Sequence, residues 1–349
     1  MDVFKPLTER QQYILGLVVR SYIEDGAPVG SKTVVTRFDL DVSSATVRNE
    51  LALLDQLGYL GQLHTSGGRV PTELGFRYFV HRLMGEIHLP RSEQQMIKHQ
   101  FHQADVEIQQ WLRLAAAVLA RISHGASFVT APRTRFTRFK HVQLISTQGR
   151  LVLLIVVLSG GLVRQQMLTL ATPLSQERLS IAANRLNAQF EGRNMDELEA
   201  RLLQHDELEQ DITRLVIEMM RSLDARSIGH IYRDGLANLI DHSETRQAIR
   251  LLEEHSLLSN VLSEFNAPEA TGVQVVIGGE GRWEELKDCT MILSRYGVDE
   301  DMIGEVAVVG PMRMPYGRNI SAVRYVSDIM SGFVNEYYAQ GSYEETTGE

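Results

Sequence analysis

The stretch SSATVRNELALLDQL, residues 43–57, decides how the N-terminal part of this chain is interpreted. Val47, Leu51 and Leu54 recur at helical spacing, so they would form one apolar side that faces a domain core. Either serine at the start of the stretch can cap a helix, and Gly58 is the expected stop. The stretch therefore predicts an amphipathic helix.

The opposite side of this predicted helix is small and polar. Arg48 and Asn49 carry side chains suited to bidentate contacts with guanine and adenine in a major groove, and alanines beside them allow a close approach. The hydroxyls of Ser43, Ser44 and Thr46 can meet phosphate where the free amides and the helix dipole favour anions. These five residues are the candidate DNA contacts of the helix. For this helix alone, an ordinary three-helix domain with a solvated polar face remains the alternative.

Two helices are predicted before this one. Thr8 and Gln11 form a capping-box pattern at the start of the first, and the turn sequence at residues 25–28 ends it. Ser31 can cap a short second helix, which a brief link joins to residues 43–57. A short helix, a tight link and a further helix make a helix-turn-helix, whose second helix reads bases.

A hairpin is predicted directly after the third helix. Two short extended arms, residues 59–63 and 69–71, flank a glycine-rich tip. Small donors, two glycines and an arginine suit a wing that lies against a phosphate backbone or a minor groove. A generic polar loop is the alternative, which the helices before the hairpin disfavour. The candidate wing contacts are His64, Thr65, Ser66, Gly67, Gly68 and Arg69.

The remainder of the chain carries two groups of strand signals. Segments 141–146, 151–158 and 162–170 are separated by turn sequences and predict an antiparallel meander with a buried middle strand. The second group comprises residues 273–277, 290–296 and 305–309.

A helical and charged block, residues 175–264, lies between these groups of strands. Met219 and Met220 fall on its clearest apolar face, which suits either a core or a dimer interface. A helix at about 320–333 follows the last strand.

Strands, a helical block and more strands indicate one α+β domain that carries a largely helical insertion. Two separate C-terminal domains are the alternative. The predicted division is a winged-helix domain at 1–84, a linker and helix at 85–104, a split α+β domain at 105–174 and 265–337, an inserted domain at 175–264, and a disordered acidic tail at 338–349.

Composition limits the classes of protein that fit. The 349 residues are 44% hydrophobic and 23% charged, which is an ordinary globular balance for a chain of more than one domain. The net charge of −9 permits DNA binding, because phosphate contacts depend on local basic clusters. We find no apolar run of about 18 residues and no secretory signal. The single cysteine, Cys289, fits a reducing cytosol, so we expect a cytoplasmic protein without a membrane partner.

Three possible chemical sites are weak. Residues 278–281 (Gly-Gly-Glu-Gly) match neither a dinucleotide-binding nor a P-loop pattern, so a strand-end turn is the better interpretation. Cys289 has no neighbouring histidine and is interpreted as a buried thiol. The 11 histidines are scattered without metal-ligand spacing. We therefore expect no enzyme, no cofactor and no metal.

Three segments resemble the heat-inducible transcription repressor HrcA family. They are Ser44-Ala45-Thr46-Val47-Arg48-Asn49-Glu50-Leu51, Leu57-Gly58-Tyr59-Leu60 and His64-Thr65-Ser66-Gly67-Gly68-Arg69-Val70-Pro71-Thr72. The resemblance continues through residues 75–80 and, more weakly, to Gly310-Pro311, Met314 and Tyr316. Gly67 stands where the family more often has alanine. The resemblance implies a winged helix, a GAF-like domain, an inserted dimerisation domain, repression of chaperone operons from an inverted-repeat operator, and support by the chaperonin.

Two other functions remain open. The DNA-binding head can be combined with a GAF-like domain that senses a small ligand, although no convergent charged cluster marks such a site. The region of residues 273–309 can also be interpreted as a catalytic fold that uses Cys289. The ligand-sensing regulator is the main alternative to a repressor that is controlled by dimerisation and by the supply of folded protein.

Overall fold

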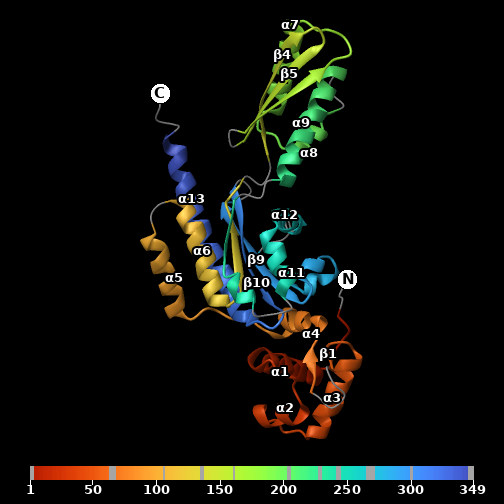
Figure 1. The fold of residues 1–349 in the computed structure, drawn as a ribbon, viewed down its shortest axis with the longest axis vertical. Helices are drawn as coiled ribbons and strands as arrows, with labels where there is room; N and C mark the ends of the chain where they lie inside the picture. The colour runs from red at the N-terminus through yellow and green to blue at the C-terminus, as the bar shows by residue number, and fades with distance from the viewer. Residues whose placement is uncertain are drawn as a thin grey trace. The chain divides into compact units, whose positions relative to one another are not determined.

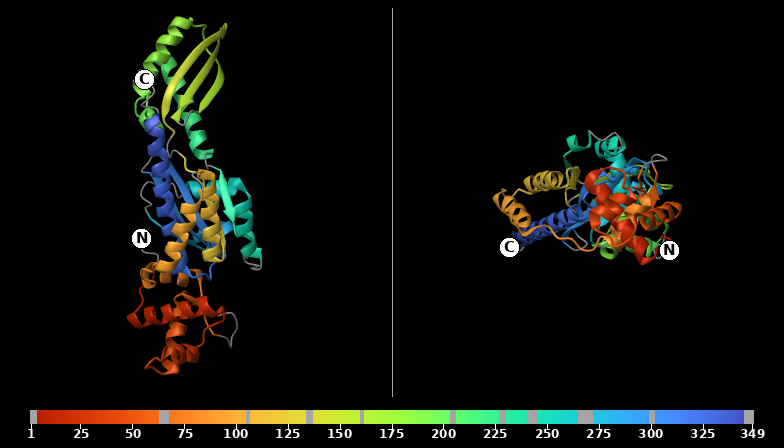
Figure 2. Two further views of the ribbon diagram at one scale, coloured as in Figure 1. Left: turned by 90° about the vertical axis from the view of Figure 1, so that its left-hand side faces the viewer. Right: turned by 90° about the horizontal axis from the view of Figure 1, so that it is seen from below.

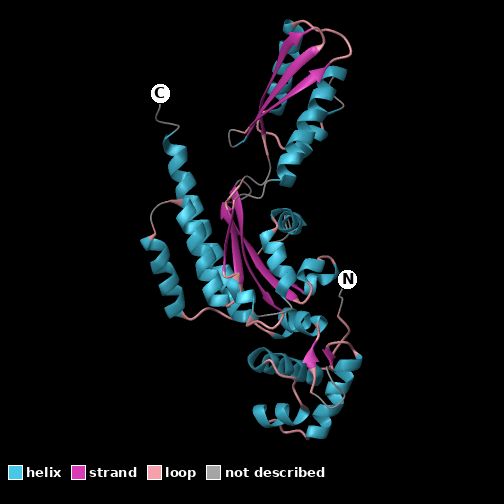
Figure 3. Ribbon diagram, viewed as in Figure 1, coloured by secondary structure: helices cyan, strands magenta, loops and turns pink. Residues whose placement is uncertain are grey.

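The computed structural model describes residues 4–62, 68–104, 107–133, 137–159, 162–202, 206–226, 230–240, 245–264, 272–298 and 302–344. The chain forms two compact units. Unit 1 comprises Met1–Ala131, His230–Tyr296 and Gly304–Glu349, and unit 2 comprises Pro132–Gly229 and Gly297–Ile303. Helices and sheets occur in both (Figure 3), so the protein is of the α+β class that the sequence predicts.

The N-terminal part of unit 1, residues 4–84, is called the head. It contains α1 (Glu9–Asp25), α2 (Ser31–Phe38), α3 (Ser44–Gln56), β1 (Leu60–Gly61), β2 (Val70–Pro71), α4 (Glu73–Tyr78) and the π-helical turn η1 (Phe79–Leu83) (Figure 1). Thr8 and Gln11 form the predicted capping box at the start of α1, and Gly26 ends it in the left-handed conformation at φ 68°.

The core of the head comes from the apolar sides of its helices. Leu15 and Val18 of α1, Val34 of α2, and Val47 and Leu54 of α3 are all fully buried. Helix α3 contacts both α1 and α2, so its predicted inward side is the side that packs. The stabilisation of the head comes mainly from this burial, since each buried aliphatic side chain contributes about 1.5–3 kcal/mol.

The rest of unit 1 is built on a five-stranded sheet in the order β7-β3-β10-β9-β8. Its strands are β3 (Ala126–Thr130), β7 (Ile231–Asp234), β8 (Gln274–Ile277), β9 (Cys289–Val298) and β10 (Met302–Pro311). The β7–β3, β3–β10 and β8–β9 pairs are antiparallel.

Helices cover this sheet. Helix α6 (Ile108–Ser123) and α13 (Tyr316–Glu344) lie side by side on one face (Figures 1 and 2), and α5 (Arg91–Gln103) packs against both of them. The short α10 (Ala237–Ile240), α11 (Arg246–Glu253) and α12 (His255–Glu264) follow β7, and the 3-10 turns η5 (Gly278–Gly281) and η6 (Glu284–Leu286) follow β8.

The start of α13 is fixed by a buried phenol. Tyr316 donates a hydrogen bond to the carbonyl oxygen of Met312 at 2.6 Å, and its oxygen lies 3.1 Å from that of Thr290 on β9. Burial raises the pKa of Tyr316, so the phenol stays protonated. The segment that ends at Tyr316, which shares in the family resemblance, thus holds α13 onto the sheet.

Unit 2 is a three-stranded antiparallel sheet, in the order β4-β5-β6, covered on one face by helices. Its elements are β4 (Phe139–Gln148), β5 (Leu151–Leu158), β6 (Val163–Thr169), α7 (Gln176–Phe190), α8 (Met195–Glu199) and α9 (Glu207–Arg226). Alternate residues of β5, such as Leu154 and Val156, pack against α7 and α9 in one core. The predicted meander is therefore present.

The units divide the chain differently from the predicted domain borders. The prediction placed the meander with the later strands and began the inserted domain at residue 175, whereas β4, β5 and β6 share a core with α7 and α9. Residues 230–264 were predicted within the insertion, yet β7 to α12 belong to unit 1. The cause is that strand and helix patterns in sequence do not reveal which sheet a helix covers.

Two strands were not predicted, and part of the C-terminal tail was predicted wrongly. Strand β3 is separated from the apolar α6 only by His124 and Gly125, so it is hard to distinguish from the end of that helix. Strand β7 has four residues within a helical stretch. The tail was predicted to be disordered from residue 338, but α13 continues to Glu344.

Candidate nucleic-acid interface

Helix α3 presents Arg48 and Asn49 to solvent. Both residues are exposed, while Val47 beside them is fully buried. Neither side chain makes a hydrogen bond or an ion pair with any residue in the described part of the chain. The predicted division of α3 into an apolar inner side and a polar outer side is therefore present, and both side chains are available to a ligand.

The availability of Arg48 contrasts with that of other arginines in the head. Arg37 pairs with Glu24 at 2.5 Å and also with Asp25, and Arg10 lies 3.8 Å from Glu50. Arg20 lies over the ring of Phe79. These guanidinium groups are engaged in contacts within the head, whereas Arg48 is free of such contacts among the described residues.

The hydroxyl groups at the start of α3 are partly used by the helix itself. The Ser43 side chain caps α3 by accepting a hydrogen bond from the Thr46 amide at 3.1 Å, and its oxygen lies 3.0 Å from the Thr46 hydroxyl. Ser44 and Thr46 are half-buried, whereas Ser43 is exposed. Of the three hydroxyls predicted to meet phosphate, that of Ser43 is thus both exposed and fixed in position.

The arms of the predicted hairpin are present. Leu60 pairs with Pro71 and Gly61 with Val70, and a further bridge joins Arg69 to Val29, which lies just before α2. The backbone hydrogen bonds between Val29 and Arg69 are 2.8 and 2.9 Å. The second arm of the hairpin therefore pairs with the first arm and, through Arg69, with the segment that precedes α2. His64, Thr65, Ser66 and Gly67 at its predicted tip lie outside the described residues.

Gly68 is required by a close approach of two backbones. A Cβ atom at Gly68 would lie 2.6 Å from the Val29 carbonyl carbon and 2.7 Å from its oxygen. Any other residue would push the hairpin away from the segment that precedes α2.

Arg69 was predicted to contact DNA, but its contacts in the structure suit a residue that positions the hairpin. Its Nε lies 2.9 Å from the Asp55 Oδ2 atom of α3, and its side chain is only 19% exposed. An arginine in such an ion pair holds the second arm of the hairpin onto α3. Asp55 was not predicted as a functional residue, although it lies two turns after Arg48 on the same helix.

The start of α2 is a second candidate that was missed. Its N-cap, Gly30, makes no side-chain hydrogen bond to the helix, so no side chain caps the amides of the first turn. Lys32 and Thr33 in this turn are exposed. A lysine near uncapped helix amides is a favourable place for phosphate, and the signal in the sequence was a glycine followed by Ser-Lys-Thr.

Comparison with known proteins agrees with the resemblance seen in the sequence. The family model described as the HrcA protein C-terminal domain matches residues 109–320. The chain is 42% identical over 346 residues to a protein of Roseiflexus castenholzii, with 95% of this chain and 96% of that protein covered. The chain belongs to the HrcA family.

Other relatives in the HrcA family cover nearly the whole chain. A protein of Herpetosiphon aurantiacus is 41% identical, with 97% of this chain and 98% of the relative covered. Both relatives are named heat-inducible transcription repressor HrcA, so the family is one of transcription repressors and not of enzymes. A crystal structure described only as that of a hypothetical protein has a TM-score of 0.56 and 25% identity, covering 95% of this chain and 99% of its own.

Two residues predicted as a weak dimer interface lie in unit 2. Met220 is fully buried in the core of that unit, and Met219 is partly buried against the same core. The position of Met220 agrees with the core interpretation, and the partly buried Met219 fits either interpretation. Cys289 is likewise fully buried, at the start of β9.

No helix in the described part of the chain is long and apolar enough to cross a membrane.

Proposed function

We propose that this protein is a transcription repressor whose head binds DNA as a winged helix-turn-helix. Helix α3 enters the major groove, Arg48 and Asn49 contact base edges, and Ser43 and the start of α2 contact phosphate. The observation that carries this proposal is the pair of exposed, unpaired side chains on a helix whose other side is fully buried.

The repressor acts as a homodimer on an inverted-repeat operator. A two-fold axis would place two copies of α3 in successive major grooves, and a single head would make about half of the phosphate contacts. Support for a dimer comes from unit 2, where β5 carries apolar residues on both faces. The uncovered face, called the outer sheet face, carries the apolar residues Ile145, Leu151, Leu153, Ile155, Val157, Val163 and Met167, with the polar residues His141, Gln143, Gln165 and Thr169 beside them in the register.

The outer sheet face fits a second copy of the same surface. Val163 and Met167 on the edge strand β6 are 56% and 52% exposed, and Leu153 lies between Ile145 and Met167 in the register. Exposed apolar residues that cluster on one face, with polar residues at its edges, are typical of a protein–protein contact surface. The inserted unit 2 is thus the proposed dimerisation domain, and the five-stranded part of unit 1 is the proposed GAF-like domain.

The repressed genes are those of the heat-shock response, and the chaperonin supports the active form. This part of the proposal rests on the names of the relatives, which call them heat-inducible, and on the family resemblance. Such a protein acts on DNA in the bacterial cytoplasm. A ligand-controlled regulator is the alternative.

The operator is the direct test of this function. Selection of bound duplexes from a random DNA library should yield an inverted repeat whose half-sites are one or more helical turns apart. Gel shifts should then show binding to this duplex at salt concentrations that abolish binding to random DNA. Equal affinity for both duplexes at every salt concentration would contradict the proposal.

The oligomeric state tests the dimer surface. Met167→Lys places a charge on the outer sheet face and should convert the dimer to a monomer in analytical ultracentrifugation. Gln189→Lys, at an exposed position on α7, is the matched control and should leave the dimer intact. A Met167→Lys variant that remains dimeric would show that another surface joins the two chains.

A further inference from the structure

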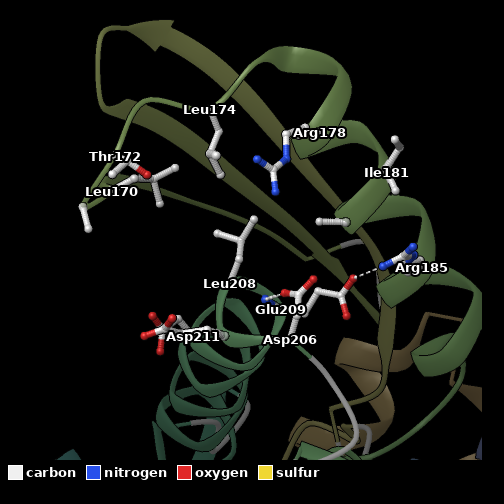
Figure 4. Close-up of a pocket in the computed structure, with 13 residues that line it drawn as sticks. Leu170, Thr172, Leu174, Arg178, Ile181, Arg185, Asp206, Leu208, Glu209 and Asp211 are labelled. Carbon is white, nitrogen blue, oxygen red and sulfur yellow. Dashed lines mark hydrogen bonds and ion pairs between the residues drawn. The ribbon is translucent and has the colours of Figure 1, made fainter.

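Unit 2 has a groove between α7 and the start of α9 whose buried charge is held within the protein (Figure 4). The Glu209 side chain is only 5% exposed, and its Oε1 lies 3.5 Å from Nη1 of Arg185. The Glu209 amide also donates a hydrogen bond to Asp206 at 3.0 Å, which fixes the first turn of α9. The groove thus belongs to the packing of α7 against α9.

Unit 1 contains contacts that the DNA-binding function does not explain, between the head and the sheet-bearing part of the same unit. The head contributes the end of α1 and helix α4, and the rest of the unit contributes η5 and the segment 310–316. These contacts form a surface called the head junction. It consists of Gly26, Glu73, Phe76, Gly278, Arg313 and Tyr316.

Two aromatic rings form the buried part of the head junction. Phe76 of α4 and Tyr316 of α13 are both fully buried, and their ring centroids lie 5.9 Å apart. The Phe76 ring also lies 6.2 Å from that of Tyr22 on α1. A head that moved away from the sheet would expose the Phe76 ring to water, so burial of this ring favours the docked position.

Arg313 contacts the carbonyl end of α1. Its Nη1 lies 3.5 Å from the carbonyl oxygen of Ile23, which belongs to the last turn of that helix. Helix α1 has no basic residue of its own in this turn, so Arg313 supplies the positive charge that the helix dipole favours there. Gly26 leaves the space for it, because a Cβ atom at Gly26 would lie 2.6 Å from Nη1 of Arg313. Arg313 therefore holds the end of α1 close to the start of α13.

Two further close approaches join the head and its linker to the rest of unit 1. A Cβ atom at Gly278 of η5 would overlap the Glu73 carboxylate of α4. In the linker, Ile87 packs so closely on Gly317 of α13 that a Cβ atom there would overlap its side chain. The Ser321 hydroxyl donates a hydrogen bond to the Ile87 carbonyl oxygen. The linker is thus attached to α13 along its course.

We propose that the head junction holds the head in one orientation, and that Arg313 thereby determines which separation of half-sites the repressor accepts. This inference rests on the proposed function, in which the two heads of a dimer bind two half-sites. Heads on loose tethers reach half-sites at many separations, whereas heads in a fixed orientation reach only those that present both grooves to them. Arg313 is thus a positioning residue that acts on operator selection without touching DNA.

Gel shifts of the full chain with a set of duplexes test the proposal. Each duplex carries the same two half-sites, and their separation is changed in steps of one base pair over a full helical turn. The wild-type protein should bind its preferred separation about tenfold or more tightly than separations half a turn away. Arg313→Glu should reduce this preference to about threefold or less, because the carbonyl end of α1 repels the new carboxylate and releases the head. Its binding to a duplex with a single half-site should be unchanged.

Arg91→Glu is the matched control. Arg91 is exposed at the start of α5 and makes no hydrogen bond or ion pair with the head among the described residues, so this variant has the same net charge as Arg313→Glu. It should keep the wild-type preference. An Arg313→Glu variant that also keeps this preference, or that loses affinity equally at every separation, would overturn the proposal. A wild-type protein that selects its half-site but accepts every separation would overturn it too, and would leave the repressor function intact.

Hydrogen exchange of the full chain without DNA gives a readout that does not depend on the operator. Amides of α4 should exchange several-fold faster in Arg313→Glu than in Arg91→Glu, because release of the head exposes the side of α4 that carries Phe76. Equal exchange in the two variants would show that Arg313 does not hold the head.

Discussion

Arg48 and Asn49 owe their expected role to their surroundings as much as to their chemistry. Exposed arginines and asparagines are common on helices, and most of them are solvated. In this head several other arginines are used in ion pairs or ring contacts, while Arg48 lies one residue after the buried Val47 and is free of them in the described structure. That combination gives α3 a rigid base and an unused polar edge.

Replacing these two side chains should affect specificity. Arg48→Ala and Asn49→Ala should each weaken operator binding by about 1–3 kcal/mol and relax the base preference at one position in each half-site. Competition gel shifts with single-base operator variants measure both effects. Lys32→Ala is the control, since loss of a phosphate contact should weaken binding to all duplexes and reduce the salt slope by about one. If specificity is unchanged in both α3 variants, α3 is not the recognition helix.

The ion pair between Arg69 and Asp55 makes a second prediction at this scale. If Arg69 positions the hairpin, then Asp55→Asn should weaken binding to all duplexes much as Arg69→Ala does, because either change releases the hairpin from α3. The salt slope should stay nearly constant, since no phosphate contact is lost.

The opposite result is expected if Arg69 binds phosphate. A phosphate-binding Arg69 would be released by Asp55→Asn, and affinity would then rise together with the salt slope. The sequence indicates the phosphate role for Arg69, because it shows an arginine beside a glycine-rich tip. It cannot show the partner of Arg69, which lies 14 positions earlier in the chain.

At the scale of elements, the hairpin depends on Gly68. Gly68→Ala should weaken operator binding because its Cβ would meet the backbone of Val29 and move the hairpin. Gly61→Ala in the partner arm is the matched control, since its Cβ would lie 3.6 Å from Thr72 in ordinary contact. Circular dichroism should show that the helices persist in both variants. Equal operator affinity of the two variants would mean that the position of the hairpin does not matter for binding.

Local signals explain which elements were predictable. The starts of α1, α3 and α4 coincide with Thr8, Ser43 and Thr72, whose side chains accept hydrogen bonds from the first turns. The β5 strand is an apolar run between turns, and its position in a meander follows from chain order. Such features depend on residues that are close in sequence.

The central sheet of unit 1 was harder to predict, because its neighbours are distant in sequence. Strand β3 pairs with β7 and β10, so Val129 lies opposite both Tyr232 and Val306. The pairing of these strands is not indicated by any pattern among residues that are close in sequence. The buried Glu305 shows the same difficulty, since its carboxylate accepts a hydrogen bond from Thr130, 175 positions away.

At the scale of the whole molecule, the sheet of unit 2 has one face without a helix, and the proposed dimerisation through this face offers a route by which heat could act. The strands of unit 2 bury one face under α7 and α9, and in the proposed dimer a second chain covers the outer sheet face. A monomer would expose this face to water, where it would favour aggregation and capture by a chaperonin. In the proposed repressor, conditions that dissociate the dimer would therefore also weaken operator binding.

Mild heating should therefore abolish operator binding in a way that depends on protein concentration. Dissociation is favoured by dilution, so dilute samples should lose binding at lower temperature than concentrated ones. Gel shifts after heating and cooling, with and without chaperonin and ATP, measure the loss and the recovery. We expect chaperonin to restore binding by the wild-type protein, and we expect Gln189→Lys to behave in the same way. Loss that is independent of concentration would show that heat acts within a single chain rather than on the contact between two, and no recovery with chaperonin would contradict the proposed support by the chaperonin.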